Sequence, residues 1–155
     1  MRKGCDVPAY VHSQRVFNIL KDFGYSEEVR LGGLLHDVIE DAGVTVEELK
    51  ELGCSDRTIK LVLLATHDIE MEHGDEQWVM LLAQLIKADD QDAWAIKTAD
   101  ILDNVRSCMS MVAHRRAFMR HVKGPLFLSL IRKKKLHDGL FQALKEVVDN
   151  GIEKE

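Results

Sequence analysis

The chain has 155 residues, of which 46% are hydrophobic and 30% charged, and its formal net charge is −5. This length predicts one domain, residues 1–155, large enough to bury a core without disulfides, and the composition excludes a disordered chain. The acidic balance argues against a nucleic-acid-binding protein, which would carry a basic excess, although it leaves room for a local basic pocket.

The hydrophobic runs of the chain are short. The longest, at residues 61–65 and 78–83, are far too short to span a bilayer, and the first residues do not form a signal peptide. The cysteines are odd in number and widely spaced, which is typical of reduced thiols that fill space in a core: Cys5, Cys54 and Cys108. We therefore expect a cytoplasmic protein without membrane contact.

Hydrophobic residues recur at helical spacing along the chain, and no useful stretch alternates as a strand would. The fold class is therefore predicted to be all-α. Helices are expected at about residues 10–23, 26–42, 45–53, 55–66, 75–87 and 92–109, with two or three more between residues 111 and 148.

The predicted boundaries come from capping residues and glycines. Ser26, Thr45 and Ser55 are expected to cap the second, third and fourth helices, and Thr45 forms a capping-box pattern with Glu48. The first three helices are expected to end at glycines, which are Gly24, Gly43 and Gly53. The second helix is thus predicted to continue unbroken from Ser26 through Ala42, with a stripe at Leu31, Leu34, Leu35, Val38 and Ala42.

That second helix contains the most informative motif, His36-Asp37-Val38-Ile39-Glu40-Asp41. His36 and Glu40 are four residues apart, as are Asp37 and Asp41, so a helix would cluster these groups within about one turn. Three carboxylates beside an imidazole repel one another unless a cation or solvent relieves them. The alternative is a solvent-exposed acidic stripe with a surface histidine, which is common on helices.

The His-Asp dipeptide alone is a weak signal, because it also occurs at His67-Asp68 and His137-Asp138. The first of these is expected at a helix end before a polar loop, and the second follows the basic run at residues 132–135, so we interpret both as surface pairs. Only His36-Asp37 lies in a strongly hydrophobic helix and precedes a second acidic pair. We therefore expect the acidic edge of that helix to face a cleft.

Two other helices carry polar residues in hydrophobic surroundings. His12 lies on the hydrophobic stripe of the first helix, where an ordinary hydrogen-bonded core histidine is the simpler interpretation. Lys97, Asp100 and Asn104 share one face of the helix at residues 92–109, and Asp100 alone would be an ordinary helix aspartate. Lys97 is also a candidate cation for an anionic substrate.

Taken together, the order His … His-Asp-x-x-Glu-Asp … Asp-x-x-x-Asn resembles the HD phosphohydrolase superfamily. More narrowly, it resembles the guanosine tetraphosphate hydrolase domain of RelA/SpoT proteins and their small stand-alone relatives. The stretches that carry the resemblance are residues 8–12 (PAYVH), 34–41 (LLHDVIED), 44–48 (VTVEE), 65–67 (ATH) and 96–104 (IKTADILDN). The resemblance covers about residues 2–106 and implies a helical HD-domain bundle, while the tail matches only as generic helices.

The resemblance implies a metal site and a water-activating pair. One divalent ion, usually manganese, would be bound by two imidazoles and two carboxylates, those of His12, His36, Asp37 and Asp100. This mixed ligand set suits a six-coordinate transition metal with open positions for water. A bound metal lowers the pKa of its water from about 15.7 toward about 7, and Glu40 and Asp41 match the pair that orients and activates this water.

The resemblance also implies contacts with the substrate. Asn104 matches a nucleotide contact, and Arg2 and Lys3 match an Arg-Lys segment that contacts the base and phosphates. The expected reaction is metal-dependent removal of the 3′-pyrophosphate from guanosine tetraphosphate or pentaphosphate, and we expect no synthetase activity. Two alternatives stay open: an HD phosphatase acting on another nucleotide, and a catalytically inactive, metal-binding regulatory domain. The sequence leaves the oligomeric state open.

Overall fold

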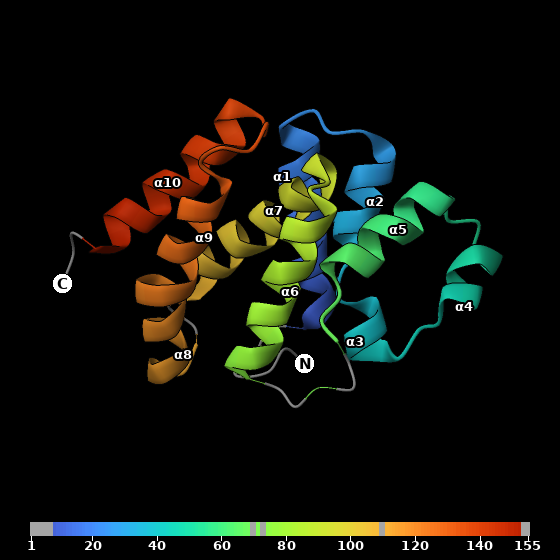
Figure 1. Ribbon diagram of the computed structural model, residues 1–155, viewed down its shortest axis with the longest axis horizontal. Helices are drawn as coiled ribbons and strands as arrows, with labels where there is room; N and C mark the ends of the chain where they lie inside the picture. Colours follow the sequence, from blue (N-terminus) through green and yellow to red (C-terminus); the bar gives the residue numbers. More distant parts are fainter. Residues whose placement is uncertain (1–7, 69–70, 72–73, 109–110, 153–155) are drawn as a thin grey trace.

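The computed structural model of the chain describes residues 8–68, 71, 74–108 and 111–152. Over these residues every regular element is a helix, which confirms the all-α prediction (Figure 1). In chain order the elements are α1 (Ala9–Asp22), α2 (Glu27–Leu35), α3 (Val38–Ala42), α4 (Val46–Glu51), α5 (Asp56–Ala65), α6 (Asp75–Ala88), α7 (Gln91–Ser107), α8 (Ala113–Phe118), a π-helical segment η2 (Met119–Lys123), α9 (Gly124–Ile131) and α10 (Asp138–Ile152).

The predicted helix starts are confirmed by capping hydrogen bonds. The side chains of Ser26, Thr45 and Ser55 each accept a backbone N–H three residues further on, at the first turns of α2, α4 and α5. Thr45 and Glu48 form the predicted capping box, in which each side chain accepts the backbone N–H of the other residue. Local side-chain chemistry is therefore sufficient to position these three helix starts.

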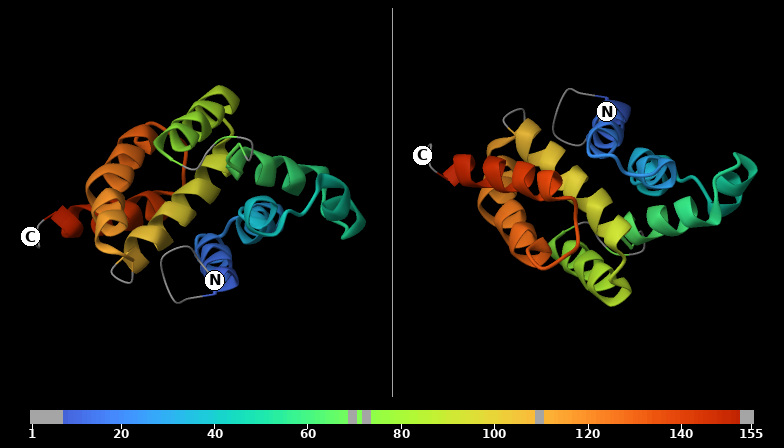
Figure 2. Two further views of the ribbon diagram at one scale, coloured as in Figure 1. Left: turned by 90° about the horizontal axis from the view of Figure 1, so that it is seen from below. Right: turned by 90° about the horizontal axis from the view of Figure 1, so that it is seen from above.

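Helix α7 lies at the centre of the molecule. It packs against α1, α2 and α5 on one side and against η2, α9 and α10 on the other, as Figures 1 and 2 show. Every residue from Ala93 to Val105 is buried. A helix that is buried on all sides carries its polar residues into the interior, so Lys97, Asp100, Asp103 and Asn104 all lie inside the molecule.

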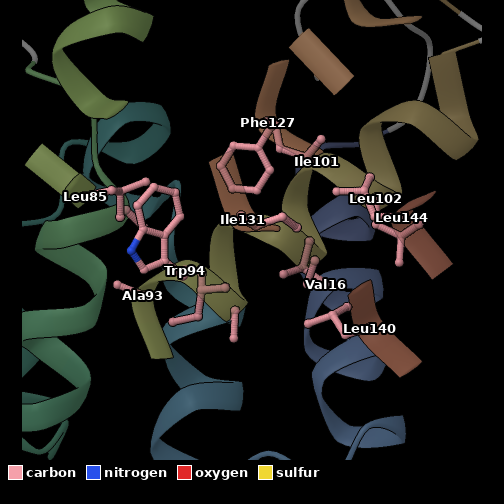
Figure 3. Close-up of a cluster of buried hydrophobic side chains, with 14 of the residues drawn as sticks. Val16, Leu85, Ala93, Trp94, Ile101, Leu102, Phe127, Ile131, Leu140 and Leu144 are labelled. Carbon is pink, nitrogen blue, oxygen red and sulfur yellow. The ribbon is translucent and has the colours of Figure 1, made fainter. Parts of the chain in front are cut away.

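The main hydrophobic core surrounds α7. Figure 3 shows side chains from α1, α6, α7, α9 and α10 that meet in it, and Trp94 packs against Phe127 with ring centroids 5.8 Å apart. A smaller cluster of Leu49, Ile59 and Val62 packs against Val38 and Ile39 of α3. No helix among the described residues is both long and apolar enough to cross a membrane. Of the cysteines, Cys108 is buried, Cys54 is half-buried and Cys5 lies outside the described residues.

The predicted unbroken helix from Ser26 to Ala42 is wrong, because the chain leaves the helix at His36 and Asp37 and starts α3 at Val38. In a continuous helix, the carbonyl of Gly33 would accept the amide of Asp37. Here that carbonyl accepts a 2.8 Å hydrogen bond from Nδ1 of His36, and Asp37 has φ −104° and ψ 0°. The His36 side chain thus binds the carbonyl of Gly33 at the point where the chain leaves the helix.

The predicted stripe on the second helix is also wrong in detail. The residues of α2 that the structure buries are Val29, Gly32 and Gly33, whereas Ala42 is exposed and the predicted leucines are half-buried. A Cβ atom on Gly33 would lie 2.4 Å from Leu20, and one on Gly32 would lie 2.8 Å from Ile96. The two glycines therefore let α2 approach α1 and α7 closely, which brings His36 to the other site residues.

Candidate metal centre and active site

Four predicted ligands converge from three places in the fold: His12 on α1, His36 and Asp37 at the break after α2, and Asp100 on α7. Ligand atoms of His12, His36 and Asp37 all lie within 4.8 Å of one another. Oδ1 of Asp100 lies 3.1 Å from Nε2 of His12 and 3.8 Å from Nε2 of His36. Residues that are up to 88 positions apart in sequence thus form one cluster.

Hydrogen bonds on the far sides of both imidazoles orient their Nε2 atoms into the cluster. Nδ1 of His12 donates to Oδ2 of Asp103 at 2.6 Å, and Nδ1 of His36 donates to the carbonyl of Gly33. Nε2 of His36 is fully buried, and it faces Oδ2 of Asp37 at 3.1 Å and Oδ1 of Asp100 at 3.8 Å, an ion pair that lacks the geometry of a hydrogen bond. An imidazole whose Nδ1 is hydrogen-bonded and whose buried Nε2 faces carboxylates is the usual arrangement for a histidine that binds a metal through Nε2. The residues present therefore fit a divalent metal.

The electrostatics of the cluster favour a cation at this position. Burial would lower the pKa of His36, but Asp37 and Asp100 outweigh it and raise this pKa to about 9. Burial would raise the pKa of Asp37, but His36 outweighs it and lowers this pKa to about 2. In the absence of a metal, a proton on His36 thus balances part of the acidic charge, and a metal ion would have to displace it.

Asp100 is held in place by its own helix. Nζ of Lys97 lies 2.8 Å from Oδ2 of Asp100, and the amide of Asn104 donates to Oδ1. Lys97 is only 2% exposed, and the carboxylates of Asp100 and Asp37 raise its pKa despite the opposing effect of burial. The predicted shared face is confirmed. In this structure, however, Lys97 neutralises the candidate ligand Asp100, and Asn104 lines a cavity.

Glu40 forms contacts that the sequence did not predict. Its Oε1 accepts the backbone N–H of His67 at 2.6 Å, and Nδ1 of His67 lies 3.0 Å from Oε1 and 3.1 Å from Oε2. The side chains of His67 and Glu40 are 16% and 18% exposed. The prediction that His67-Asp68 is a surface pair is therefore wrong for His67. The corresponding prediction for His137-Asp138 is confirmed, since both residues are exposed.

Asp37 and Asp41 lie at the boundary between two cavities. One cavity of about 310 Å³ has acidic and basic residues in its lining, which consists of Asp37, Asp41, Asn104, Met111, Arg115, Phe118, Met119 and Lys123. The other, of about 370 Å³, is lined mainly by hydrophobic or small residues: Tyr10, Ser13, Gln14, Leu34, Val38 and Ala42, together with the same two aspartates. A larger groove of about 560 Å³, which Leu64, Leu81 and Lys87 help to line, contains none of the predicted site residues.

Besides His67, three residues that contact this region were missed by the sequence analysis. Asp103 supports His12 and also binds Arg15, whose Nε lies 2.7 Å from Oδ1. Arg115 and Lys123 come from the tail that was interpreted as generic helices. Burial, together with repulsion from Lys97, lowers the pKa of Lys123 to about 8. The four-residue spacing from Asn104 to Asp100 and the neighbouring Asp103 were visible in sequence, but nothing local indicated the tail residues.

Arg2 and Lys3, the predicted contacts with base and phosphates, lie outside the described residues. Glu40 and Asp41, the predicted water-activating pair, lie on α3 beside the candidate metal cluster, Glu40 against His67 and Asp41 at the cavity boundary. The structure thus brings together every predicted site residue that it describes. Two of them are paired with other side chains, Lys97 with Asp100 and Glu40 with His67.

No protein-family model matches the chain. Two curated proteins are similar to it in sequence. The guanosine-3′,5′-bis(diphosphate) 3′-pyrophosphohydrolase of Aquifex aeolicus (strain VF5) is 33% identical over 103 residues, which is 64% of this chain. A probable enzyme of the same name from Synechocystis sp. (strain ATCC 27184 / PCC 6803 / Kazusa) is 30% identical over 112 residues, or 68% of this chain. The matched region spans 14% of the length of each of these relatives.

Two solved structures share the fold. A protein described as a metazoan ortholog of SpoT that hydrolyzes ppGpp superimposes with a TM-score of 0.81 at 24% identity, covering 96% of this chain and 86% of that one. The structure of lmo0812 from Listeria monocytogenes EGD-e gives a TM-score of 0.73 at 21% identity, covering 94% and 98%. In sequence and in fold, this chain is therefore similar to the HD-type hydrolase domain of RelA/SpoT proteins, which confirms the resemblance that its motifs indicate.

Proposed function

We propose that this chain hydrolyses the 3′-pyrophosphate of guanosine tetraphosphate or pentaphosphate with the help of one divalent transition metal, most fittingly Mn²⁺. The observation that carries the proposal is the position of Asp37. This candidate ligand belongs to the His-Asp cluster and also lines the cavity that contains Arg115 and Lys123. A phosphate group in that cavity would therefore lie next to the metal cluster, between acidic residues that bind the cation and basic residues that bind the anion.

Each side chain has a role that follows from its place. The metal, when bound, supplies a water of lowered pKa and neutralises charge that develops on the phosphate. Glu40 and Asp41, on α3 directly after the ligand Asp37, are the carboxylates that would take the proton of the attacking water. Lys97 lies 2.8 Å from Asp100, where its charge offsets a ligand in the metal-free protein.

The two cavities suggest how the nucleotide would lie. The departing pyrophosphate carries several negative charges, and Arg115 and Lys123 offer charge-assisted hydrogen bonds to it. The nucleoside would occupy the less polar cavity on the other side of Asp37, where Tyr10 is 69% exposed and offers a surface for a base. Arg2 and Lys3 stay proposed contacts of the same substrate, and we propose that the reaction takes place in the cytoplasm.

The test is hydrolysis of guanosine tetraphosphate by the Mn²⁺-loaded protein, with pyrophosphate and orthophosphate measured separately. We expect pyrophosphate release, and we expect the Glu40→Gln/Asp41→Asn double variant to retain metal but lose turnover. Orthophosphate release from other nucleotides, with the tetraphosphate left intact, would favour an HD phosphatase of different specificity. Bound metal without hydrolysis of any nucleotide would favour a regulatory domain.

A further inference from the structure

Residue 67 holds the carboxylate of Glu40 from two directions. The backbone N–H of His67 donates to Oε1 at 2.6 Å, while Nδ1 of its ring lies within 3.1 Å of both oxygens. An ionised carboxylate can only accept hydrogen bonds, so Nδ1 is the protonated ring nitrogen in this pair. The two residues are 27 positions apart, and both side chains are largely buried.

The segment that carries His67 is itself held by α6. Gln84 donates to the carbonyls of Leu63 and Leu64 at 3.1 and 3.2 Å, close to the C-terminal end of α5. Gln77 donates to the carbonyl of Asp68 at 2.9 Å. The backbone on both sides of residue 67 therefore has a partner on a neighbouring helix, which gives the imidazole a defined position against α3.

The charges that face Glu40 make this support important. Burial raises the pKa of Glu40, as does Asp37 to a smaller extent, while the hydrogen bonds and charge of His67 outweigh both and lower it. Among the residues that the structure describes, Lys97 and Lys123 also interact with Glu40. Without the ring of His67, Glu40 would keep one backbone hydrogen bond and would lie half-buried next to another carboxylate, which favours protonation and rotation of its side chain.

We propose that His67 is a positioning residue that holds Glu40 in place for water activation. The inference rests on the proposed function, in which Glu40 belongs to the proton-accepting pair. It assigns to His67 a hydrogen-bonding role, in which Nδ1–H anchors one carboxylate, and not the role of a metal ligand or a proton shuttle. An asparagine at position 67 can place an amide N–H near the position of Nδ1. The proposal therefore predicts different effects for His67→Asn and His67→Ala.

The kinetic test compares His67→Ala with His67→Asn in the Mn²⁺-loaded protein. We expect His67→Ala to lower kcat by on the order of tenfold to hundredfold with KM within about twofold of the wild type, because a general base contributes most when it is oriented. The acidic limb of the pH profile of kcat should move to higher pH. His67→Asn should recover most of kcat, and His137→Ala, a substitution in the exposed His-Asp pair, should change nothing.

A second readout requires neither metal nor substrate. In metal-free wild-type protein, the backbone amide and the Nδ1 proton of His67 should be shifted downfield in ¹H–¹⁵N NMR spectra, and Glu40→Gln should move both upfield while His137 keeps its shifts. Shifts at residue 67 that do not respond to Glu40→Gln would overturn the proposal, and so would equal loss of kcat in the alanine and asparagine variants. If the NMR result holds but the wild type hydrolyses no nucleotide, the contact stands and the proposed function fails.

Discussion

Asp103 on α7 accepts a 2.6 Å hydrogen bond from Nδ1 of His12 on α1, across 91 residues of sequence. The carboxylate also binds Arg15, one turn further along α1, so it is held from two sides. Because Nδ1 is committed to Asp103, only Nε2 of His12 faces the other candidate ligands. This contact therefore determines which nitrogen of His12 is available to a metal, although Asp103 itself lies behind the site.

Loss of the Asp103 carboxylate should weaken metal binding. In Asp103→Ala the His12 ring loses the partner that sets its tautomer and orientation, and removal of such a partner typically costs about 10–100-fold in metal affinity. We expect a decrease of this size in Mn²⁺ affinity by calorimetry, and a smaller one in Asp103→Asn, whose amide oxygen still accepts. Asp138→Ala, at an exposed aspartate, serves as the control. Unchanged affinity in Asp103→Ala would contradict the role of Asp103 in orienting His12.

The His-Asp pair at residues 36–37 and the one at residues 137–138 should differ sharply when they are substituted. His36→Ala and Asp100→Ala each remove a candidate ligand from the buried cluster, so we expect loss of bound metal and of hydrolysis. His137→Ala and Asp138→Ala alter exposed residues outside the cluster and should retain both. Metal content by elemental analysis, together with initial rates, measures the two effects. Equal loss from Asp138→Ala would contradict the assignment of the site.

Metal binding should depend on pH through His36. The pKa of His36 is raised to about 9, so at neutral pH the metal-free protein carries a proton there that the metal must displace. Mn²⁺ affinity should therefore increase with pH up to about 9, by about tenfold per pH unit, with release of about one proton for each ion bound. Calorimetry in buffers of different ionisation enthalpy measures this proton. Binding that is independent of pH between 6 and 8 would contradict the predicted protonation of His36.

Lys123 should matter for the substrate and not for the metal. Its Nζ lies 4.3 Å from the ring centroid of Trp78 and its side chain lines the basic cavity, so Lys123→Met keeps the packing and removes the charge. We expect KM for guanosine tetraphosphate to increase about tenfold, as for loss of one charged hydrogen bond, with metal affinity unchanged. Because the pKa of Lys123 is about 8, wild-type KM should also increase above this pH.

The matched control for that experiment is Lys145→Met, since Lys145 is half-exposed and pairs with Asp149 on α10. Both variants lose one positive charge, so a general effect of net charge on nucleotide binding would appear in both. If KM changes equally in the two variants, the pyrophosphate does not bind next to Lys123. If only Lys123→Met is affected, the basic cavity holds the phosphate groups.

Much of the fold could be predicted from the sequence because its signals are local. Capping pairs such as Thr45 and Glu48 lie within one turn of each other, and Gly43 adopts the positive φ of 66° that ends α3. The polar face of α7 was also predictable, since Lys97, Asp100 and Asn104 are related by the helical repeat alone. The same local rule failed at His36, where the chain leaves a helix that the hydrophobic pattern predicts to continue and the imidazole binds the carbonyl of Gly33.

The sequence by itself therefore determined the helical class, most helix boundaries and the residues that carry the His-Asp motif. Only the tertiary structure decided which partners those residues meet. Asp103 joins His12, His67 joins Glu40, and Lys123 reaches the cavity beside Asp37 because α7 is enclosed on all sides by helices from both ends of the chain. Such contacts depend on how helices pack, and helix packing depends on the shapes of buried surfaces that no local pattern encodes.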